Sequence, residues 1–349
     1  MTTAVFTAIP APDGDPDSGV PWHYGDPHRE QRSLLQGNAA VDLSHWGVIT
    51  VTGPDRLTWL HSLTTAHMES LLPGVSITAL ILSPHGHVEQ EMHIVDDGYS
   101  TWIITPPSMA ESLTAYLDSM RFMMRVEVAD RSSEFGVVWE PVREIDQQYP
   151  TWLTPAEFAG AGVTESGADR GGTAEKYVVQ RPEFFRGRLV VIPRADLASR
   201  IAVFPERAGT WAYHALRAAA AVPQLGWETD HKTLPHEIGW IGPGVHLSKG
   251  CYRGQETVAR VHNMGHPPRR LVLLHLDGSE HGLPVHGDPV LTADGKAVGF
   301  IGTPARHYEL GPIATAVIKR SVPLDQELHV VHGDSIITAS QEVVLAGKD

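Results

Sequence analysis

The sequence is short of cysteine, of basic residues and of long apolar runs, and each shortage excludes a class of protein. Cys251 is the only cysteine in 349 residues, so an internal disulfide framework is excluded and a reducing compartment is expected. Acidic residues outnumber basic ones by 41 to 27, which gives a net charge of −14. A surface of this sign repels polyphosphate, so we expect no direct nucleic-acid binding. No apolar run approaches the ~20 residues of a membrane span, so we expect no membrane contact.

The N-terminal segment lacks the features of a signal peptide. Residues 1–21 are acidic and rich in proline, without a basic start or an apolar core. We therefore expect a cytoplasmic monomer in which residues 1–22 form a disordered tail. The composition, 42% hydrophobic and 19% charged, is typical of a globular protein, and the length allows two or three domains.

Strand and helix patterns alternate along the first half of the chain. A run with strand periodicity ends in a Gly-Pro-Asp turn at 53–55, and a short helical pattern follows it. Further strands are expected at 76–82, 87–95, 99–105 and 124–130, and a helix at 107–120. This order predicts an α+β module with a largely antiparallel sheet.

The second half is less regular. Residues 160–172 are typical of a loop, whereas "GRLVVIP" (187–193) and "RIAVF" (200–204) predict strands and residues 210–222 predict a helix. From residue 271 onwards, short strands separated by Gly, Pro and Asp turns predict a small β-barrel or sandwich.

Cys251 is the first candidate for chemistry. Lys249 and Arg253 flank it just before an expected helix, and cations and a helix start both favour the thiolate, so its pKa is expected below that of a free cysteine. The alternative is a small buried apolar side chain. The spacing of 5, 10 and 5 residues between His231, His236, His246 and Cys251 matches no zinc motif, and no phosphate-binding glycine loop is present.

The acidic strand "HVEQEMHIV" (87–95) is the second candidate. Alternation along a strand places His87, Glu89, Glu91 and His93 on one face. This face is either exposed to solvent, with the opposite face of the strand buried, or it contacts a ligand. The pattern alone favours the first interpretation.

A resemblance to a known family strengthens the case for a function of these candidate residues. The segment "KGCYRGQETVAR" (249–260) is similar to the signature Lys-Gly-Cys-Tyr-x-Gly-Gln-Glu of the YgfZ family, folate-binding proteins related to the glycine-cleavage T-protein. The segments 42–65 and 215–240 resemble other parts of these families. The resemblance implies two mixed α+β lobes within 23–266, an inner lobe at about 50–130, and a C-terminal β-barrel at 267–349, arranged as a three-domain cloverleaf around an opening the size of tetrahydrofolate.

The sequence departs from the family at three points. The Asp-Asp pair of the T-protein falls on Glu89 and Gln90, the glycine four residues after Arg217 is Ala221, and the aromatic residue before the signature is Leu247. These departures concern the folate site and leave the Cys251 segment intact.

The resemblance implies tetrahydrofolate, or a folate derivative, as the cofactor and iron–sulfur proteins or their assembly factors as partners. The function that follows is an accessory role in iron–sulfur cluster assembly or repair, which supports tRNA modification indirectly, with Cys251 as the reactive or ligating thiol. If the protein is an enzyme, the alternative is a folate-dependent aminomethyltransferase. A third hypothesis is a scaffold whose folate pocket has been lost.

For Arg217 a structural ion pair is the alternative to a folate contact. The expected cofactor-binding residues are Glu89, Arg217, Lys249, Tyr252, Gln255 and Glu256.

Overall fold

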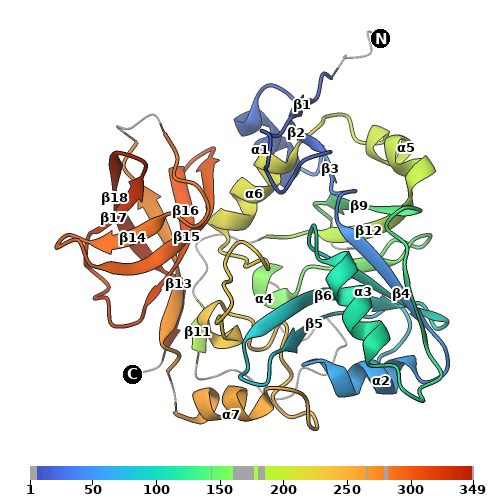
Figure 1. The fold of residues 1–349 in the computed structure, drawn as a ribbon. Coiled ribbons are helices and arrows are strands. Elements are labelled where there is room, and N and C mark those ends of the chain that lie inside the picture. The colour runs from blue at the N-terminus through green and yellow to red at the C-terminus, as the bar shows by residue number, and fades with distance from the viewer. Residues whose placement is uncertain are drawn as a thin grey trace.

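The chain folds into two lobes that each combine a sheet with helices, and a C-terminal barrel that packs beside them (Figure 1). The computed structural model describes residues 6–142, 144–159, 177–179, 185–264, 266–278 and 282–347. The loop expected at 160–172 lies outside these ranges. The expected α+β architecture with two lobes and a barrel is confirmed.

The first lobe is a five-stranded antiparallel sheet in the order β5-β6-β7-β4-β8. Helices α2 (Arg56–Leu63) and α3 (Ala110–Ser119) pack on one face, where Leu60 and Leu117 join the same apolar core as Met92. The strands expected in this lobe are confirmed, and several of them are buried at successive positions, on both faces of the sheet. The strands are β4 (Gly47–Thr52), β5 (Ser76–Leu82), β6 (Val88–Asp96), β7 (Ser100–Thr105) and β8 (Glu127–Asp130).

The second lobe contains a four-stranded sheet in the order β10-β12-β9-β3. One face packs against α1 and α6, and the other against α5. The strand expected at 200–204 is wrong, because Leu197 and Ile201, four residues apart, lie on the helical face that packs on the sheet. The elements are α1 (Pro27–Leu35), β3 (Val41–Asp42), β9 (Phe135–Glu140), β10 (Thr151–Leu153), α4 (Ala156–Ala159), β12 (Arg188–Pro193), the 3-10 helix η2 (Arg194–Asp196), α5 (Leu197–Ala202) and α6 (Thr210–Ala219).

The N-terminal segment is packed against the second lobe from residue 6 onwards, which corrects the expectation of a disordered tail at 1–22. Strands β1 (Ile9–Pro10) and β2 (Pro21–His23) pair with each other. Asp17 is 3% exposed and lies 3.1 Å from Nε2 of His45 and 3.0 Å from Nε2 of His214. Burial alone disfavours the carboxylate, but the two histidines hold the pKa of Asp17 far below its usual value. Composition did not reveal these ion pairs, since their partners lie far along the sequence.

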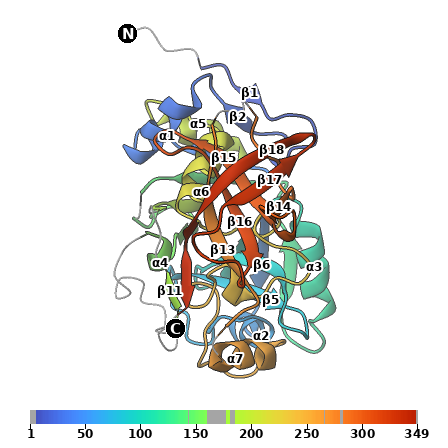
Figure 2. The ribbon, with the colours of Figure 1, turned by 90° about the vertical axis from the view of Figure 1, so that its left-hand side faces the viewer.

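The barrel is closed by six antiparallel strands and faces the viewer in Figure 2, in front of the two lobes. Along its first strand, Val272 and Leu274 point into the barrel core, whereas Leu271 and Leu273 pack against α6 and the loops before α7. The strands are β13 (Arg269–Leu276), β14 (Pro289–Thr292), β15 (Ala297–His307), β16 (Gly311–Lys319), β17 (Leu328–His332) and β18 (Ser335–Val343).

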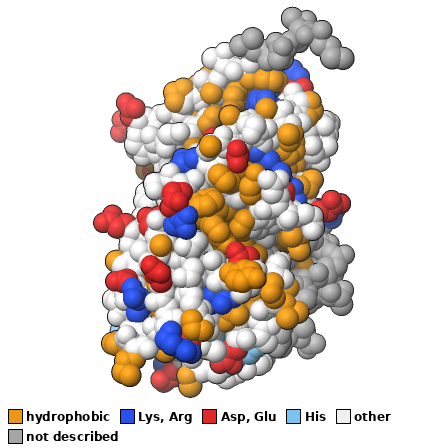
Figure 3. Space-filling view, turned by 90° about the vertical axis from the view of Figure 1, so that its right-hand side faces the viewer, with side chains coloured by type: hydrophobic (Ala, Val, Ile, Leu, Met, Phe, Trp, Pro, Cys, Tyr) orange, Lys and Arg blue, Asp and Glu red, His pale blue; other side chains and the backbone are white. Residues whose placement is uncertain are grey.

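Four further elements connect the parts. The 3-10 helix η3 (Pro235–Glu237) and α7 (Gln255–Met264) precede the barrel, and β19 (Leu345–Gly347) leaves it to pair with β11 (Tyr177–Val179). The face opposite the barrel carries acidic and basic side chains interspersed with apolar ones (Figure 3). No helix within the described residues is both long and apolar enough to span a membrane.

Candidate functional site

A narrow cavity lies where the two sheets meet α6 and the turn that follows it. Its volume is about 30 Å³, room for about one water molecule. Seven of the sixteen residues that line it are Trp, Phe or Tyr, and its polar side chains come from β5, β6, α6, the segment after β10 and the turn. The lining residues are Trp46, Thr78, Glu91, His93, Trp139, Trp152, Thr154, Phe158, Phe185, Leu189, Tyr213, Arg217, Val222, Pro223, Gln224 and Trp240.

Glu91 is the carboxyl group of this cavity. It is 2% exposed, and its Oε2 accepts a hydrogen bond of 2.7 Å from the backbone N–H of Leu225. Burial raises the pKa of Glu91 to about 8 although that hydrogen bond opposes the shift. At neutral pH the Glu91 carboxyl is therefore largely protonated, so it can both donate and accept hydrogen bonds.

His93 lies beside Glu91 between two indole rings. Its Nε2 is 3.4 Å from Glu91 Oε1, and its ring centroid is 5.7 Å from that of Trp46 and 4.2 Å from that of Trp152. Burial lowers the pKa of His93 to about 3, so the ring is neutral at physiological pH. The pair thus adds no net charge to the cavity at neutral pH.

Glu89 does not line this cavity, and the expectation that it shares a face with Glu91 is wrong. The pairing of β5 with β6 shifts between Ile81 and Leu82, which pair with Gln90 and Val88, so Glu89 is the extra residue of a β-bulge. The bulge reverses the alternation upstream of Gln90. Glu89 consequently points to the surface and forms an ion pair of 3.0 Å with Arg253.

Arg217 faces the cavity, but its guanidinium is occupied by protein partners. It is 1% exposed and donates to the carboxylate of Glu228 at 2.9 Å, to the carbonyl of Val222 at 2.6 Å and to the hydroxyl of Thr303. Its Nε donates to His214 Nδ1 at 3.3 Å. This geometry favours the structural ion pair that the sequence left open, rather than a contact with a ligand's carboxylates.

Several polar atoms around the cavity have no partner among the described residues. In native proteins nearly all buried polar atoms form hydrogen bonds, so a group of unpartnered atoms around one cavity indicates a ligand or bound water. Each belongs to a side chain that is more than nine-tenths buried. They are Thr78 Oγ1, His93 Nδ1, Trp139 Nε1 and Gln224 Oε1.

The Cys251 loop lies on another part of the molecule, between η3 and α7. Cys251 is exposed. The cations on either side of it have partners in other elements. Lys249 is 5% exposed and donates to the carbonyls of His61 and Thr64 at the end of α2, and Arg253 pairs with Glu89. Burial also lowers the pKa of Lys249 to about 8.

The remaining signature residues hold the loop or face solvent. Tyr252 is 8% exposed and packs in the central core, where burial raises its pKa to about 12. Gln255 donates to the carbonyl of Lys249 at 3.3 Å, and Glu256 is exposed. Lys249, Tyr252, Gln255 and Glu256, which the resemblance assigned to the cofactor, are not among the cavity-lining residues.

Gly254 fixes the loop against the β5–β6 turn. Its φ is +81°, and a Cβ at this position would lie 2.6 Å from the carbonyl oxygen of Ser83 and 2.8 Å from the Cα of Gly86. Only glycine allows both this conformation and this approach. The signature therefore builds a tight loop that presents Cys251 to solvent.

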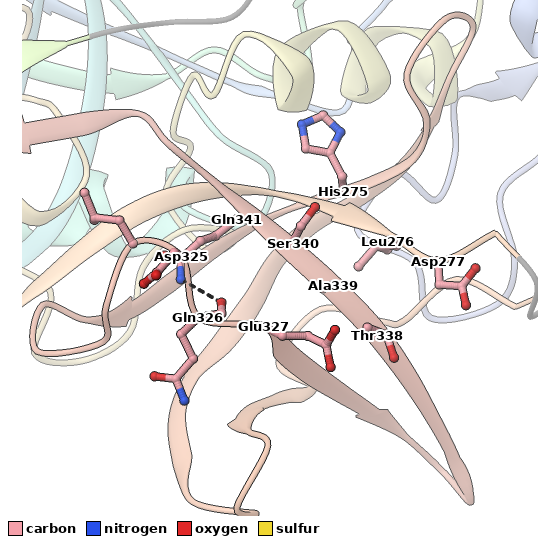
Figure 4. A pocket seen from close by; sticks show the side chains of 11 residues that line it. His275, Leu276, Asp277, Asp325, Gln326, Glu327, Thr338, Ala339, Ser340 and Gln341 are labelled. Carbon is pink, nitrogen blue, oxygen red and sulfur yellow. Dashed lines mark hydrogen bonds between the residues drawn. The ribbon is translucent and has the colours of Figure 1, made fainter.

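A second, open cavity of about 530 Å³ lies on the outer wall of the barrel (Figure 4). Three carboxylates, Asp277, Asp325 and Glu327, line it, and Gln341 Nε2 donates to the carbonyl of Gln326 at 3.1 Å across its edge. This acidic lining disfavours an anionic ligand. Within the described ranges, no three His, Cys, Asp or Glu side chains are grouped so as to hold a metal ion.

Comparisons with known proteins agree with the fold. No protein-family model matches the chain. It is 28% identical to the aminomethyltransferase of Geobacillus kaustophilus over 87% of this chain and 85% of that protein. It is 25% identical to a chloroplastic transferase-like protein of Arabidopsis thaliana over 81% of this chain, and 24% identical to the mitochondrial iron–sulfur cluster assembly factor IBA57 homologue of Cryptococcus neoformans over 67% of it. Each of these two matches spans 65% of the relative's own length.

The same architecture is found in a solved structure. The crystal structure of the glycine cleavage system aminomethyltransferase T from Bartonella henselae superposes with a TM-score of 0.70 at 17% identity, covering 97% of this chain and 92% of that one. The chain therefore has the glycine-cleavage aminomethyltransferase fold, and its sequence is similar both to aminomethyltransferases and to an iron–sulfur cluster assembly factor.

Proposed function

We propose that this chain is a folate-binding accessory protein of the YgfZ type, which acts in iron–sulfur cluster assembly or repair and thereby supports cluster-dependent tRNA modification. The proposal rests on one observation: the buried carboxyl group of Glu91 and four polar atoms that have no partner within the described ranges converge on a cavity lined by indole and phenyl rings. The sequence similarity to an iron–sulfur cluster assembly factor supports the second part.

The chemistry of the cavity suits a pterin ring. A pterin is flat and carries paired N–H donors and acceptors, which match indole walls, the Glu91 carboxyl and the Gln224 amide. The present volume of about 30 Å³ is too small for it, so binding requires lining side chains to move outward. Folate, when bound, supplies one-carbon chemistry; the residues of this chain bind and orient it and exclude water.

Cys251 is the second element of the proposal. One thiolate cannot hold a cluster, so a cluster carried as cargo needs further ligands from a partner protein. The exposure of Cys251 and the rigid loop around it suit such a transient contact. We place this activity in the cytoplasm, in a monomer that meets iron–sulfur proteins or their assembly factors.

A folate-dependent aminomethyl transferase is the second candidate. It is favoured by the similarity to aminomethyltransferases over most of the chain and by the presence of a carboxyl group in the cavity. Aminomethyl transfer does not require Cys251. Methylenetetrahydrofolate formation from an aminomethylated carrier, measured with wild-type protein and with Cys251→Ser, therefore separates the two candidates: turnover in both proteins supports the transferase.

Tetrahydrofolate titration tests the folate part. Four tryptophans line the cavity, so binding should change the intrinsic fluorescence. Glu91→Gln should weaken binding about three- to tenfold, because a hydrogen bond between neutral groups contributes about 0.5–1.5 kcal/mol. Glu89→Gln, two residues away on the surface, is the matched control and should stay within about twofold. If both variants bound tetrahydrofolate with equal affinity, Glu91 would not be a folate-binding residue.

Complementation tests the iron–sulfur part. In a strain that lacks this protein, activities of several iron–sulfur enzymes are measured after return of the wild type, Cys251→Ser or Glu91→Gln. The wild type should restore them and Cys251→Ser should not, since a hydroxyl is a poor iron ligand beside a thiolate. Full rescue by Cys251→Ser would reject the role of the thiol.

A further inference from the structure

The turn at 222–228 forms one wall of the central cavity. Gln224 contributes a side-chain oxygen that has no partner in the described part of the chain, and Leu225 contributes the N–H that donates to Glu91. The turn begins after Ala221, whose φ is +46°, a conformation that a non-glycine residue rarely adopts. A turn with this backbone needs contacts that hold it in place.

Glu228 supplies those contacts at the end of the turn. Its carboxylate is fully buried, and each oxygen serves a different part of the molecule. Oε2 accepts from Arg217 Nη1 at 2.9 Å and from the backbone N–H of Gln224 at 2.8 Å. Oε1 accepts from the hydroxyls of Thr303 and Thr315, each at 2.6 Å. Burial opposes the charge, but Arg217 and the two hydroxyls hold the pKa of Glu228 below its usual value.

The barrel is shaped to admit this carboxylate. Thr303 lies on β15 and Thr315 on β16, and the pairing of these strands shifts between Ile301 and Pro304. At Gly302 a Cβ would lie 2.6 Å from Thr315 Oγ1 and 3.1 Å from Glu228 Oε1. The bulge and the glycine together therefore make room for Glu228 on the barrel wall.

Stability alone is a poor explanation for this network. Well-packed apolar side chains often stabilise a protein as well as a buried ion pair does, whereas buried polar networks fix one arrangement of the parts that they join. Here the joined parts are the barrel and the turn that faces Glu91.

We propose that Glu228 is a positioning residue for the central cavity, through which the β15–β16 bulge of the barrel holds the 222–228 turn against Glu91. Anything that displaces β15 or β16, such as a protein bound to the barrel, then changes the groups that the turn presents to the cavity. The inference rests on the proposed function only where it speaks of a ligand in that cavity.

Amide hydrogen exchange of the full-length protein tests the proposal. Thr303→Val/Thr315→Val removes both hydroxyls on the barrel side, and the amides of residues 222–228 should then exchange at least about tenfold faster, while those of β4 stay unchanged. Thr303→Ser/Thr315→Ser keeps the hydroxyls and should behave as the wild type. Thr292→Val is the matched control, because this buried barrel threonine donates to Asp294 in its own turn.

Two outcomes overturn the proposal: unchanged exchange at 222–228 in the double valine variant, or the same acceleration in Thr292→Val. If the double variant does not fold, Thr315→Val alone is measured with the same criteria. As a second readout, tetrahydrofolate affinity should fall at least about fivefold in the valine variant and recover in the serine variant. If the wild type binds no tetrahydrofolate, the proposed function fails, whereas the exchange result still decides the role of Glu228.

Discussion

The central cavity and the Cys251 loop differ in how their polar groups are satisfied. Around the cavity, buried atoms of Thr78, His93 and Gln224 have no partner among the described residues. In the loop, Lys249 and Arg253 are both held by acceptors from other elements. Buried groups without partners indicate a place where a ligand completes the structure. In the Cys251 loop the basic side chains already have acceptors in the protein, so the loop is a structural element that exposes one thiol.

The largest contrast is expected from removing an arginine in each region. Arg217→Met leaves Glu228 buried without its cation, which should lower the free energy of unfolding by about 3–5 kcal/mol. Arg253→Met removes a half-exposed ion pair and should cost at most about 1 kcal/mol. Urea denaturation of both variants measures the difference. Similar losses would mean that the two ion pairs are equally exposed in solution.

The pH dependence of stability separates the regions next. The pKa of Glu91 is raised to about 8 in the folded protein. Its contribution to the free energy of unfolding is therefore fully present below the unfolded pKa of about 4.3 and is lost as pH rises through 8. The loss is at most about 1.4 kcal/mol per pH unit. Glu91→Gln abolishes this loss, and its stability relative to the wild type should therefore increase from pH 5 to pH 8. Denaturation at pH 5, 6.5 and 8 tests this, with Glu89→Gln as the control that keeps the wild-type profile. A flat difference for Glu91→Gln would show that Glu91 is not buried.

Two glycines of the loop provide a smaller, matched comparison. Gly254→Ala places a Cβ against Ser83 at a positive φ and should destabilise the protein by about 2 kcal/mol. Gly250→Ala should be nearly neutral, since, apart from its chain neighbours, no atom of the described residues lies within 4 Å of the added Cβ. Thermal denaturation and the alkylation rate of Cys251 are measured for both. If Gly250→Ala proves the more harmful change, the loop has another conformation in solution.

The smallest effect on the fold is expected at the thiol itself. Cys251→Ser changes one exposed atom and should alter the free energy of unfolding by less than about 0.5 kcal/mol. It should also leave tetrahydrofolate affinity unchanged, because Cys251 does not line the cavity. Calorimetry of unfolding and of binding checks both statements. A loss of folate affinity would place the loop and the cavity in one site.

Strand periodicity, together with the turn signals, predicted the strands of the first lobe, although successive residues are buried along β4, β5 and β6. It failed at Glu89, where a single extra residue in β6 reverses the pattern. A bulge of this kind depends on the partner strand and leaves no local signal. The fold class followed from the resemblance and from the turn spacing of the barrel.

The site was less predictable, because its residues are joined by contacts that are distant in sequence. The sequence placed Arg217 near the opening, and the structure adds that Glu228 and Thr303 bind its guanidinium, while Thr315 donates to Glu228. The flanking cations of Cys251 suggested an activated thiol, whereas Lys249 binds the end of α2, 185 or more residues earlier. Ala221 could have been noticed, since the family's glycine at that position corresponds to a backbone with positive φ.

The partners of Glu228 also determine when the cavity is assembled during synthesis. Thr303 and Thr315 follow Glu228 by 75 and 87 residues, so the turn at 222–228 emerges from the ribosome long before the hydroxyls that hold it. Contacts this distant in sequence form late and slowly in folding. In a nascent chain, Arg217 and Glu228 are therefore without the two threonine hydroxyls of the barrel. The cavity is complete only after the barrel strands have folded onto the lobes.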